Sequence, residues 1–124
     1  MHLSVDSTLS LAELRVSLPR ALASLGLGID RISDIPARGF VVELVDPLPA
    51  VEAEDPADPL ARSTWKVAVY ARTGGGSRLS TVRPTHLVDL MDRPGAAAPA
   101  LAFEGALERA LLSAAGRPDA DRPS

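Results

Sequence analysis

Short runs in which hydrophobic and polar residues alternate, or in which nearly every residue is apolar, predict five β-strands. A period of two residues places successive side chains on opposite faces of a sheet. The run from Phe40 to Val45 is apolar on both faces except at Glu43, so we expect it to lie inside the sheet. Thr73 and the three glycines after it predict a hairpin turn between the last two strands, because glycine adopts the positive φ of such turns. The expected strands are residues 2–6, 28–35, 40–45, 64–72 and 77–83.

A helix is predicted over residues 10–25, because leucines recur there every three or four positions and form one apolar stripe. Ser10 and Glu13 fit a capping box, in which each side chain binds a backbone amide at the start of the helix. Gly26 follows the last leucine, where helices commonly end on a residue in the left-handed conformation. The start and the end of this helix are therefore both marked in the sequence.

Pro19 lies in the middle of the same helical pattern. Proline has no amide hydrogen to donate, and its ring meets the preceding turn of an α-helix. We expect a helix that kinks at Pro19. The alternative is a helix that begins again at Ser17, with the proline in its first turn.

Two further helices are predicted in the second half of the chain. Thr85 can cap a short helix that carries Leu87, Val88, Leu90 and Met91. Residues 92–99 read as a linker of small residues, and residues 46–60, which hold four prolines, read as a surface connection. An amphipathic closing helix is marked by Phe103, Leu107, Ala110, Leu111 and Ala114.

The order of these elements predicts an α+β fold, in which an antiparallel sheet carries helices on one face in the order β-α-β(4)-α. The chain has 124 residues, which suits one domain. We expect that domain to cover residues 1–115. Residues 116–124 are polar and rich in proline, so we expect a disordered C-terminal tail.

Composition narrows the classes of partner. The chain has no cysteine, and Met1 to Val5 lacks the basic and apolar regions of a signal peptide, so we expect a cytoplasmic protein. The formal net charge of −3 argues against nucleic acid, and no apolar stretch is long enough to span a bilayer. Aromatic residues make up only 3% of the chain, so the core must be aliphatic. Dimerisation is a natural way to bury more aliphatic surface.

Three local features resemble the domain of unknown function family 302. They are the capped helix that runs into Leu25-Gly26-Leu27-Gly28, the strand that ends at Asp46-Pro47 before an acidic segment, and the stretch from Trp65 to Pro84. The resemblance implies the β-α-β(4)-α fold and a homodimer, and it implies no settled activity. Members of the family frequently carry cysteine near the second and third features, where this chain has none, so no thiol chemistry carries over.

Motifs that would indicate catalysis or metal binding all have simpler interpretations. Ser63 to Lys66 matches S-x-x-K, but the segment leads into a strand, where residues three apart point to opposite faces. The glycine run opens a strand, whereas a phosphate-binding loop opens a helix. The acidic residues of the 46–60 segment match no calcium loop, and His86 has no thiol partners for zinc. We therefore expect no metal and no cofactor.

The richest mixture of polar and aromatic groups surrounds the end of the last expected strand. We propose that it binds a small ligand, with Arg83 making a charge-assisted contact. The leading hypothesis is a non-catalytic binding or accessory module that acts as a homodimer. One alternative is a small cofactor-free enzyme that uses His86 with Arg83 or Asp89, and another is a purely structural interaction protein. The candidate ligand-binding residues are Trp65, Tyr70, Thr81, Arg83 and His86.

Overall fold

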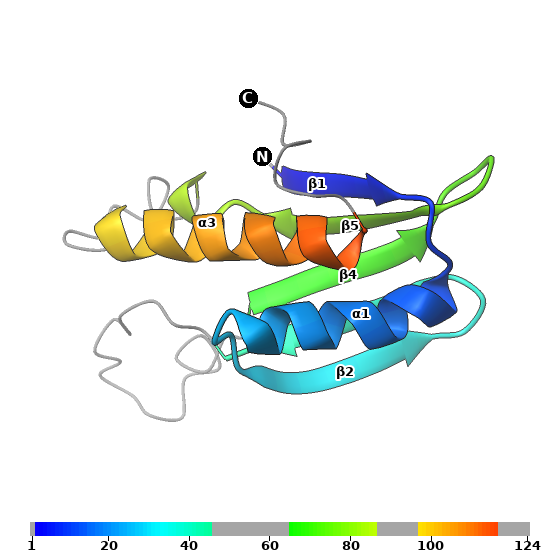
Figure 1. Cartoon of the computed structure of the whole chain (residues 1–124), viewed down its shortest axis with the longest axis horizontal. Coiled ribbons are helices and arrows are strands. Elements are labelled where there is room, and N and C mark those ends of the chain that lie inside the picture. The colour runs from blue at the N-terminus through cyan, green and yellow to red at the C-terminus, as the bar shows by residue number, and fades with distance from the viewer. Residues whose placement is uncertain (1, 46–64, 87–96, 117–124) are drawn as a thin grey trace, which may run out of the picture.

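Five strands form one antiparallel sheet in the computed structural model, which describes residues 2–45, 65–86 and 97–116 (Figure 1). The strand order across the sheet is β1-β5-β4-β3-β2, so β4 lies at the centre and β3 lies inside the sheet, as the sequence predicts. All five expected strands are confirmed. Their bounds are β1 His2–Ser7, β2 Ile29–Ile35, β3 Gly39–Leu44, β4 Trp65–Ala71 and β5 Ser77–Val82.

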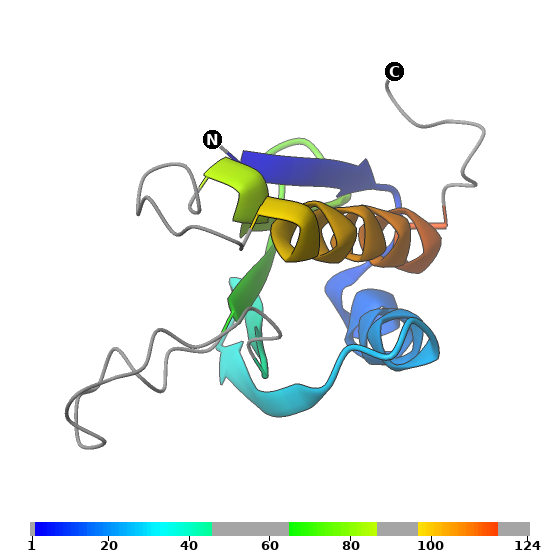
Figure 2. The same ribbon diagram turned by 90° about the vertical axis from the view of Figure 1, so that its left-hand side faces the viewer.

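Two long helices, α1 (Leu11–Ser24) and α3 (Ala97–Ala114), lie side by side on the same side of the sheet. Figure 2 shows both helices nearly end-on, with the sheet curving around them from the blue β1 above to the cyan β2 below. The other side of the sheet carries no helix of the described residues. The α+β fold and the β-α-β(4)-α order are therefore confirmed.

Helix α1 begins and ends where the sequence predicts. Ser10 Oγ accepts a hydrogen bond from the Glu13 amide at 3.2 Å, and the Ser10 amide donates to Glu13 Oε1 at 3.4 Å, which completes the capping box. Gly26 has a φ of +77° at the other end. There the amides of Gly26 and Leu27 donate to the carbonyls of Ala23 and Leu22, both at 3.0 Å, as in a Schellman motif.

Replacing Ser10 by alanine is expected to lower the free energy of unfolding by about 1 kcal/mol, because the Glu13 amide loses its acceptor. Ser10→Asp is the matched control, since aspartate also accepts from that amide and its charge favours a helix N-terminus. Urea denaturation followed by circular dichroism measures both variants. Equal losses for alanine and aspartate would contradict the capping role.

Pro19 is accommodated inside a single helix, so the alternative of a second start at Ser17 is wrong. Leu18 and Leu22 flank the proline and are both fully buried. Burial of leucines on this face stabilises the helix by more than the one backbone hydrogen bond that Pro19 removes. The Ser17 hydroxyl donates to the Ala114 carbonyl at 2.9 Å, and so it joins α1 to the end of α3 instead of capping a new helix.

Helix α3 begins earlier than expected, at Ala97, so residues 97–99 belong to it and not to a linker. Pro99 is accepted there because amides of the first helical turn have no carbonyl partner within the helix. The short helix expected after Thr85 already starts at Pro84, another proline in a first turn, and its remainder lies outside the described residues. The connection at 46–60 and tail residues 117–124 also lie outside them.

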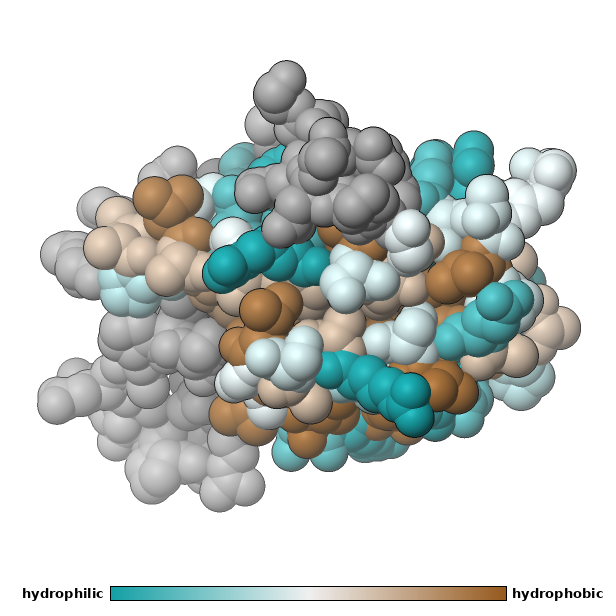
Figure 3. All heavy atoms as spheres, viewed as in Figure 1, coloured by the Kyte–Doolittle hydropathy of each residue, from teal (hydrophilic) through white to brown (hydrophobic). Residues whose placement is uncertain are grey.

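The core between the sheet and the helices is aliphatic, as the composition predicts. Trp65 and Phe103 are the large aromatic residues that join it at the end of the sheet near the start of α3. The outer side of the helices mixes hydrophobic and hydrophilic residues (Figure 3). Its exposed apolar side chains include Val16 and Leu101. The fully buried leucines are Leu14, Leu18, Leu22, Leu44, Leu79, Leu107, Leu111 and Leu112.

Candidate functional site

Trp65 and Thr81, two of the five predicted ligand-binding residues, contact each other inside the protein. The Trp65 indole N–H donates to Thr81 Oγ1 at 2.9 Å, and the Thr81 hydroxyl donates to the Lys66 carbonyl at 2.8 Å. The Trp65 ring packs against Phe103 of α3 in a T-shaped arrangement, with the ring centroids 5.4 Å apart and the planes at 77°. Both residues are buried, so their polar groups serve each other and the backbone.

Arg83 and His86 follow β5 at the same end of the sheet. Arg83 lies 3.5 Å from Glu104 Oε2 of α3, and Glu104 also accepts from the Thr85 hydroxyl at 2.8 Å. The His86 amide donates to the Arg83 carbonyl at 3.1 Å, which closes the turn that starts at Pro84. Arg83 therefore already has an acidic partner. Asp89, which the enzyme hypothesis pairs with His86, lies outside the described residues.

Tyr70 is separated from the other four predicted residues. It lies five residues beyond Trp65 on β4, about 17 Å away along the strand, and its side chain points to the opposite face of the sheet. Four of the five residues thus lie at one end of the molecule, and Tyr70 lies at the other. Their ligand-binding role stays a prediction. Because Tyr70 lies at the other end of the sheet, one small ligand cannot contact all five residues.

The side of the sheet that no described helix covers, named here the open face, presents three rows of side chains across the strands. The short row crosses the middle and consists of small residues, and the tyrosine row lies toward the hairpin turn. The lysine row lies at the opposite end. The short row is Ser4, Ser80, Ala68, Val41 and Ser33. The tyrosine row is Asp6, Arg78, Tyr70, Gly39 and Ile35. The lysine row is His2, Val82, Lys66, Glu43 and Arg31.

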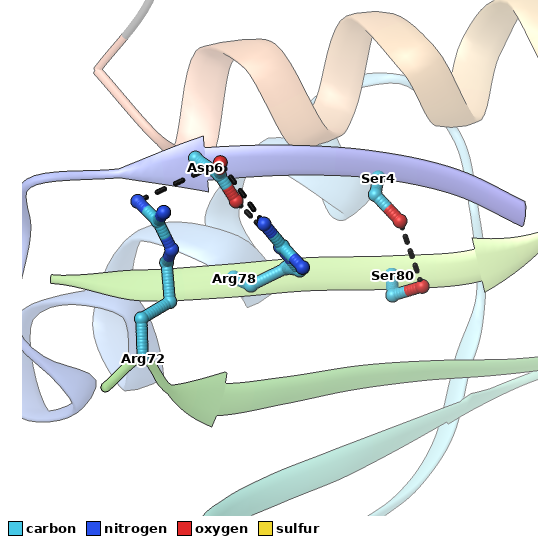
Figure 4. Close-up of polar contacts among 5 residues, drawn as sticks. All are labelled: Ser4, Asp6, Arg72, Arg78 and Ser80. Carbon is cyan, nitrogen blue, oxygen red and sulfur yellow. Dashed lines mark hydrogen bonds and ion pairs between the residues drawn. The ribbon is translucent and has the colours of Figure 1, made fainter. Parts of the chain in front are cut away.

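An ion-pair cluster lies at the β1 end of the tyrosine row, where Asp6 contacts both Arg72 and Arg78 (Figure 4). Arg78 binds Asp6 through two nitrogens, Nε at 2.6 Å and Nη2 at 3.3 Å. Arg72 Nη1 is farther from the carboxylate, at 3.6 Å. The hydrogen bond with Asp6, followed by one with Tyr70, raises the pKa of Arg78 above its ordinary value. Arg78 therefore makes the close contact with the Asp6 carboxylate, and Arg72 makes the longer one.

A surface pocket of about 580 Å³ opens beside this cluster. It lies where the end of β1, the hairpin turn between β4 and β5, and the end of α3 meet. Volumes of this size are typical of sites for small molecules. The pocket is lined by Asp6, Ser7, Thr8, Arg72, Gly74, Gly75, Gly76, Ala115 and Gly116.

Sequence reasoning missed the Asp6–Arg72–Arg78 cluster and its pocket. The three residues lie on β1, after β4 and on β5, and β1 is 70 residues away in the sequence from its partner strand β5. Nothing local pairs Asp6 with Arg78. The alternation of the expected strands carried one usable signal, because it places Asp6, Tyr70 and Arg78 on polar faces.

Two properties of the described residues bear on metal binding and on membrane spanning. They include no group of three or more histidine, cysteine, aspartate or glutamate side chains placed to hold a metal ion. None of their helices combines the length and the apolar character needed to cross a bilayer.

Comparison with known proteins identifies the fold. No protein-family model and no curated protein matches the chain. A solved structure, an uncharacterized conserved DUF302 protein from Bacillus stearothermophilus, is similar to it with a TM-score of 0.67 and 20% sequence identity. The similarity covers 89% of this chain and 94% of that one. The chain therefore has a DUF302-like α+β fold, as its motifs predict.

Proposed function

We propose that this DUF302-like domain is a non-catalytic binding module that works as a homodimer, in which the open faces of two copies pack together. The observation that supports this proposal is the open face itself. Its apolar side chains include Ile35, Tyr70 and Val82, which are 44%, 39% and 37% exposed. The short row between the flanking rows lets a second sheet approach closely.

The charges of the open face suit a second copy in one orientation. A two-fold axis that runs across the strands places the lysine row of one copy over the tyrosine row of the other. Lys66 then meets the ring of Tyr70, and His2 meets Asp6, so no like charges face each other. A two-fold axis that runs along the strands would instead place Lys66 of one copy against Lys66 of the other copy. We therefore propose the axis across the strands.

The size of the face sets the expected strength of the dimer. Five strands span about 24 Å, and six residues extend about 20 Å along each strand. The face therefore measures about 480 Å², below the roughly 800 Å² per partner of stable interfaces and in the range of weak, transient ones. We expect a dissociation constant in the micromolar range.

Sedimentation velocity over a concentration series around the micromolar range tests the dimer. Ala68 lies in the middle of the short row and is half-buried, so Ala68→Glu places a desolvated negative charge at the proposed contact. We expect this variant to sediment as a monomer at concentrations where the parent protein is a dimer.

Ala102→Glu is the matched control, because Ala102 is exposed on α3 and far from the open face. It should dimerise like the parent protein. Circular dichroism must show the same fold in both variants. A strict monomer for the parent protein, or equal dimerisation of the two glutamate variants, would overturn the proposal.

A further inference from the structure

We propose that the pocket beside the glycine turn binds a small anion through a carboxylate or phosphate group, with Arg72 as the principal contact. The site goes beyond the proposed dimer, because most of the pocket lies at the hairpin end of the molecule, outside the three rows. It also differs from the five residues expected to bind a ligand. Four of those lie at the opposite end of the sheet.

The charge balance of the cluster favours an anion. Asp6 contributes one negative charge, and the guanidinium groups of Arg72 and Arg78 contribute two positive charges. Arg78 takes the short, two-nitrogen contact with Asp6, whereas Arg72 Nη1 stays at 3.6 Å. The Arg72 side chain is 41% exposed and lines the pocket. A planar guanidinium in this position can bind the two oxygens of a carboxylate or phosphate side by side.

The rest of the pocket wall suits a small polar ligand. Three consecutive glycines present backbone without side chains there, and an added Cβ at Gly74 or Gly75 would meet nothing within 4 Å. The Gly75 amide is used by the turn, where it donates to the Arg72 carbonyl at 3.2 Å. Thr8 adds an exposed hydroxyl to the wall. A ligand can therefore approach the turn backbone closely.

The end of α3 is the feature that opposes an anion, since the C-terminus of a helix carries partial negative charge. Its last carbonyls are nevertheless capped. The Ser17 hydroxyl donates to the Ala114 carbonyl, and the Ser7 hydroxyl donates to the Ala115 carbonyl, both at 2.9 Å. These hydroxyls reduce the negative potential that α3 adds, and the positive charge of Arg72 outweighs what remains.

Titration of the ¹⁵N-labelled full chain with inorganic phosphate, and separately with acetate, tests the site by NMR at constant ionic strength. We expect saturable shifts of the amides of Thr8 and Gly74 to Gly76. Arg72→Gln should weaken this binding at least about tenfold, because it removes the positive charge and the guanidinium donors and leaves a polar side chain. Saturation with phosphate alone, or with acetate alone, identifies which oxyanion the pocket takes.

Two further variants test whether the shifts come from this pocket. Arg20→Gln removes an exposed arginine of α1 and should leave the affinity unchanged. Thr8→Asp adds a carboxylate to the wall of the pocket and should abolish the shifts. Shifts that do not saturate, or that Arg72→Gln leaves unchanged, would overturn the site. Sedimentation of the same samples reports the dimer independently, since Arg72 lies outside the three rows.

Discussion

Replacing Gly39 by alanine is expected to lower the free energy of unfolding by roughly 3 kcal/mol or more. Gly39 begins β3 and pairs with Tyr70 of β4. A Cβ at this position would overlap the Val69 carbonyl oxygen and lie 2.9 Å from the Tyr70 Cα. Both are backbone atoms of the central strand, so the clash can be relieved only by moving β3 away from β4.

A loss of this size would be a large part of the stability of a small domain, which is typically about 5–15 kcal/mol. Urea denaturation followed by circular dichroism gives the difference directly. Gly105→Ala is the matched control, because Gly105 lies inside α3 and an added Cβ there meets nothing within 4 Å. The same chemical change should stabilise that helix by about 0.5–1 kcal/mol. Changes of the same sign at both glycines would contradict the role of the close approach at Gly39.

The second large effect is expected at Trp65, where alanine should cost about 3–5 kcal/mol. The side chain is 6% exposed and packs against Phe103, so truncation leaves a cavity between the sheet and the start of α3. Trp65→Phe keeps an aromatic ring beside Phe103 and loses the indole N–H. It should therefore cost clearly less. Circular dichroism is the measurement, because Trp65 is the one tryptophan of the chain.

Thr81 separates the packing of Trp65 from its hydrogen bond. Thr81→Val keeps the shape and leaves the indole N–H without its acceptor, at a cost of about 1–3 kcal/mol. Thr81→Ser keeps the hydroxyl and should cost less. If the hydrogen bond stabilises the fold, Thr81→Val should have a smaller effect in the Trp65→Phe background, where the donor is already absent. Full additivity of the two changes would mean that the hydrogen bond contributes nothing.

These stability effects also bear on the ligand-binding role expected for Trp65 and Thr81. Each residue already uses its polar group on a partner within the protein. A ligand at this place would have to compete with those partners, whereas the contact of Arg72 with Asp6 is longer, at 3.6 Å. For this reason we locate the anion site at the hairpin turn.

The secondary structure could be predicted from the sequence because its signals are local. The capping box at Ser10, the left-handed Gly26 and the alternation along β4 each involve neighbours in the chain. Such local signals determined the bounds of α1 and the strand pattern that predicts the α+β class. The errors fell at Pro84 and Pro99, which lie in first turns of helices, whereas Pro19 lies inside one helix as expected. Burial of the surrounding helix face and the spare amides of a first turn decided these positions.

The candidate sites depend on strand pairing, which only the tertiary structure decided. A sequence shows which residues alternate, but it does not show that β1 pairs with β5, or that Asp6 stands opposite Arg78. The rows of the open face combine five strands from residues 2 to 82, and the pocket adds the end of α3. The physical reason is that strand order and register result from the burial of one sheet face beneath both helices at once. That burial is a property of the whole chain, and no single segment encodes it.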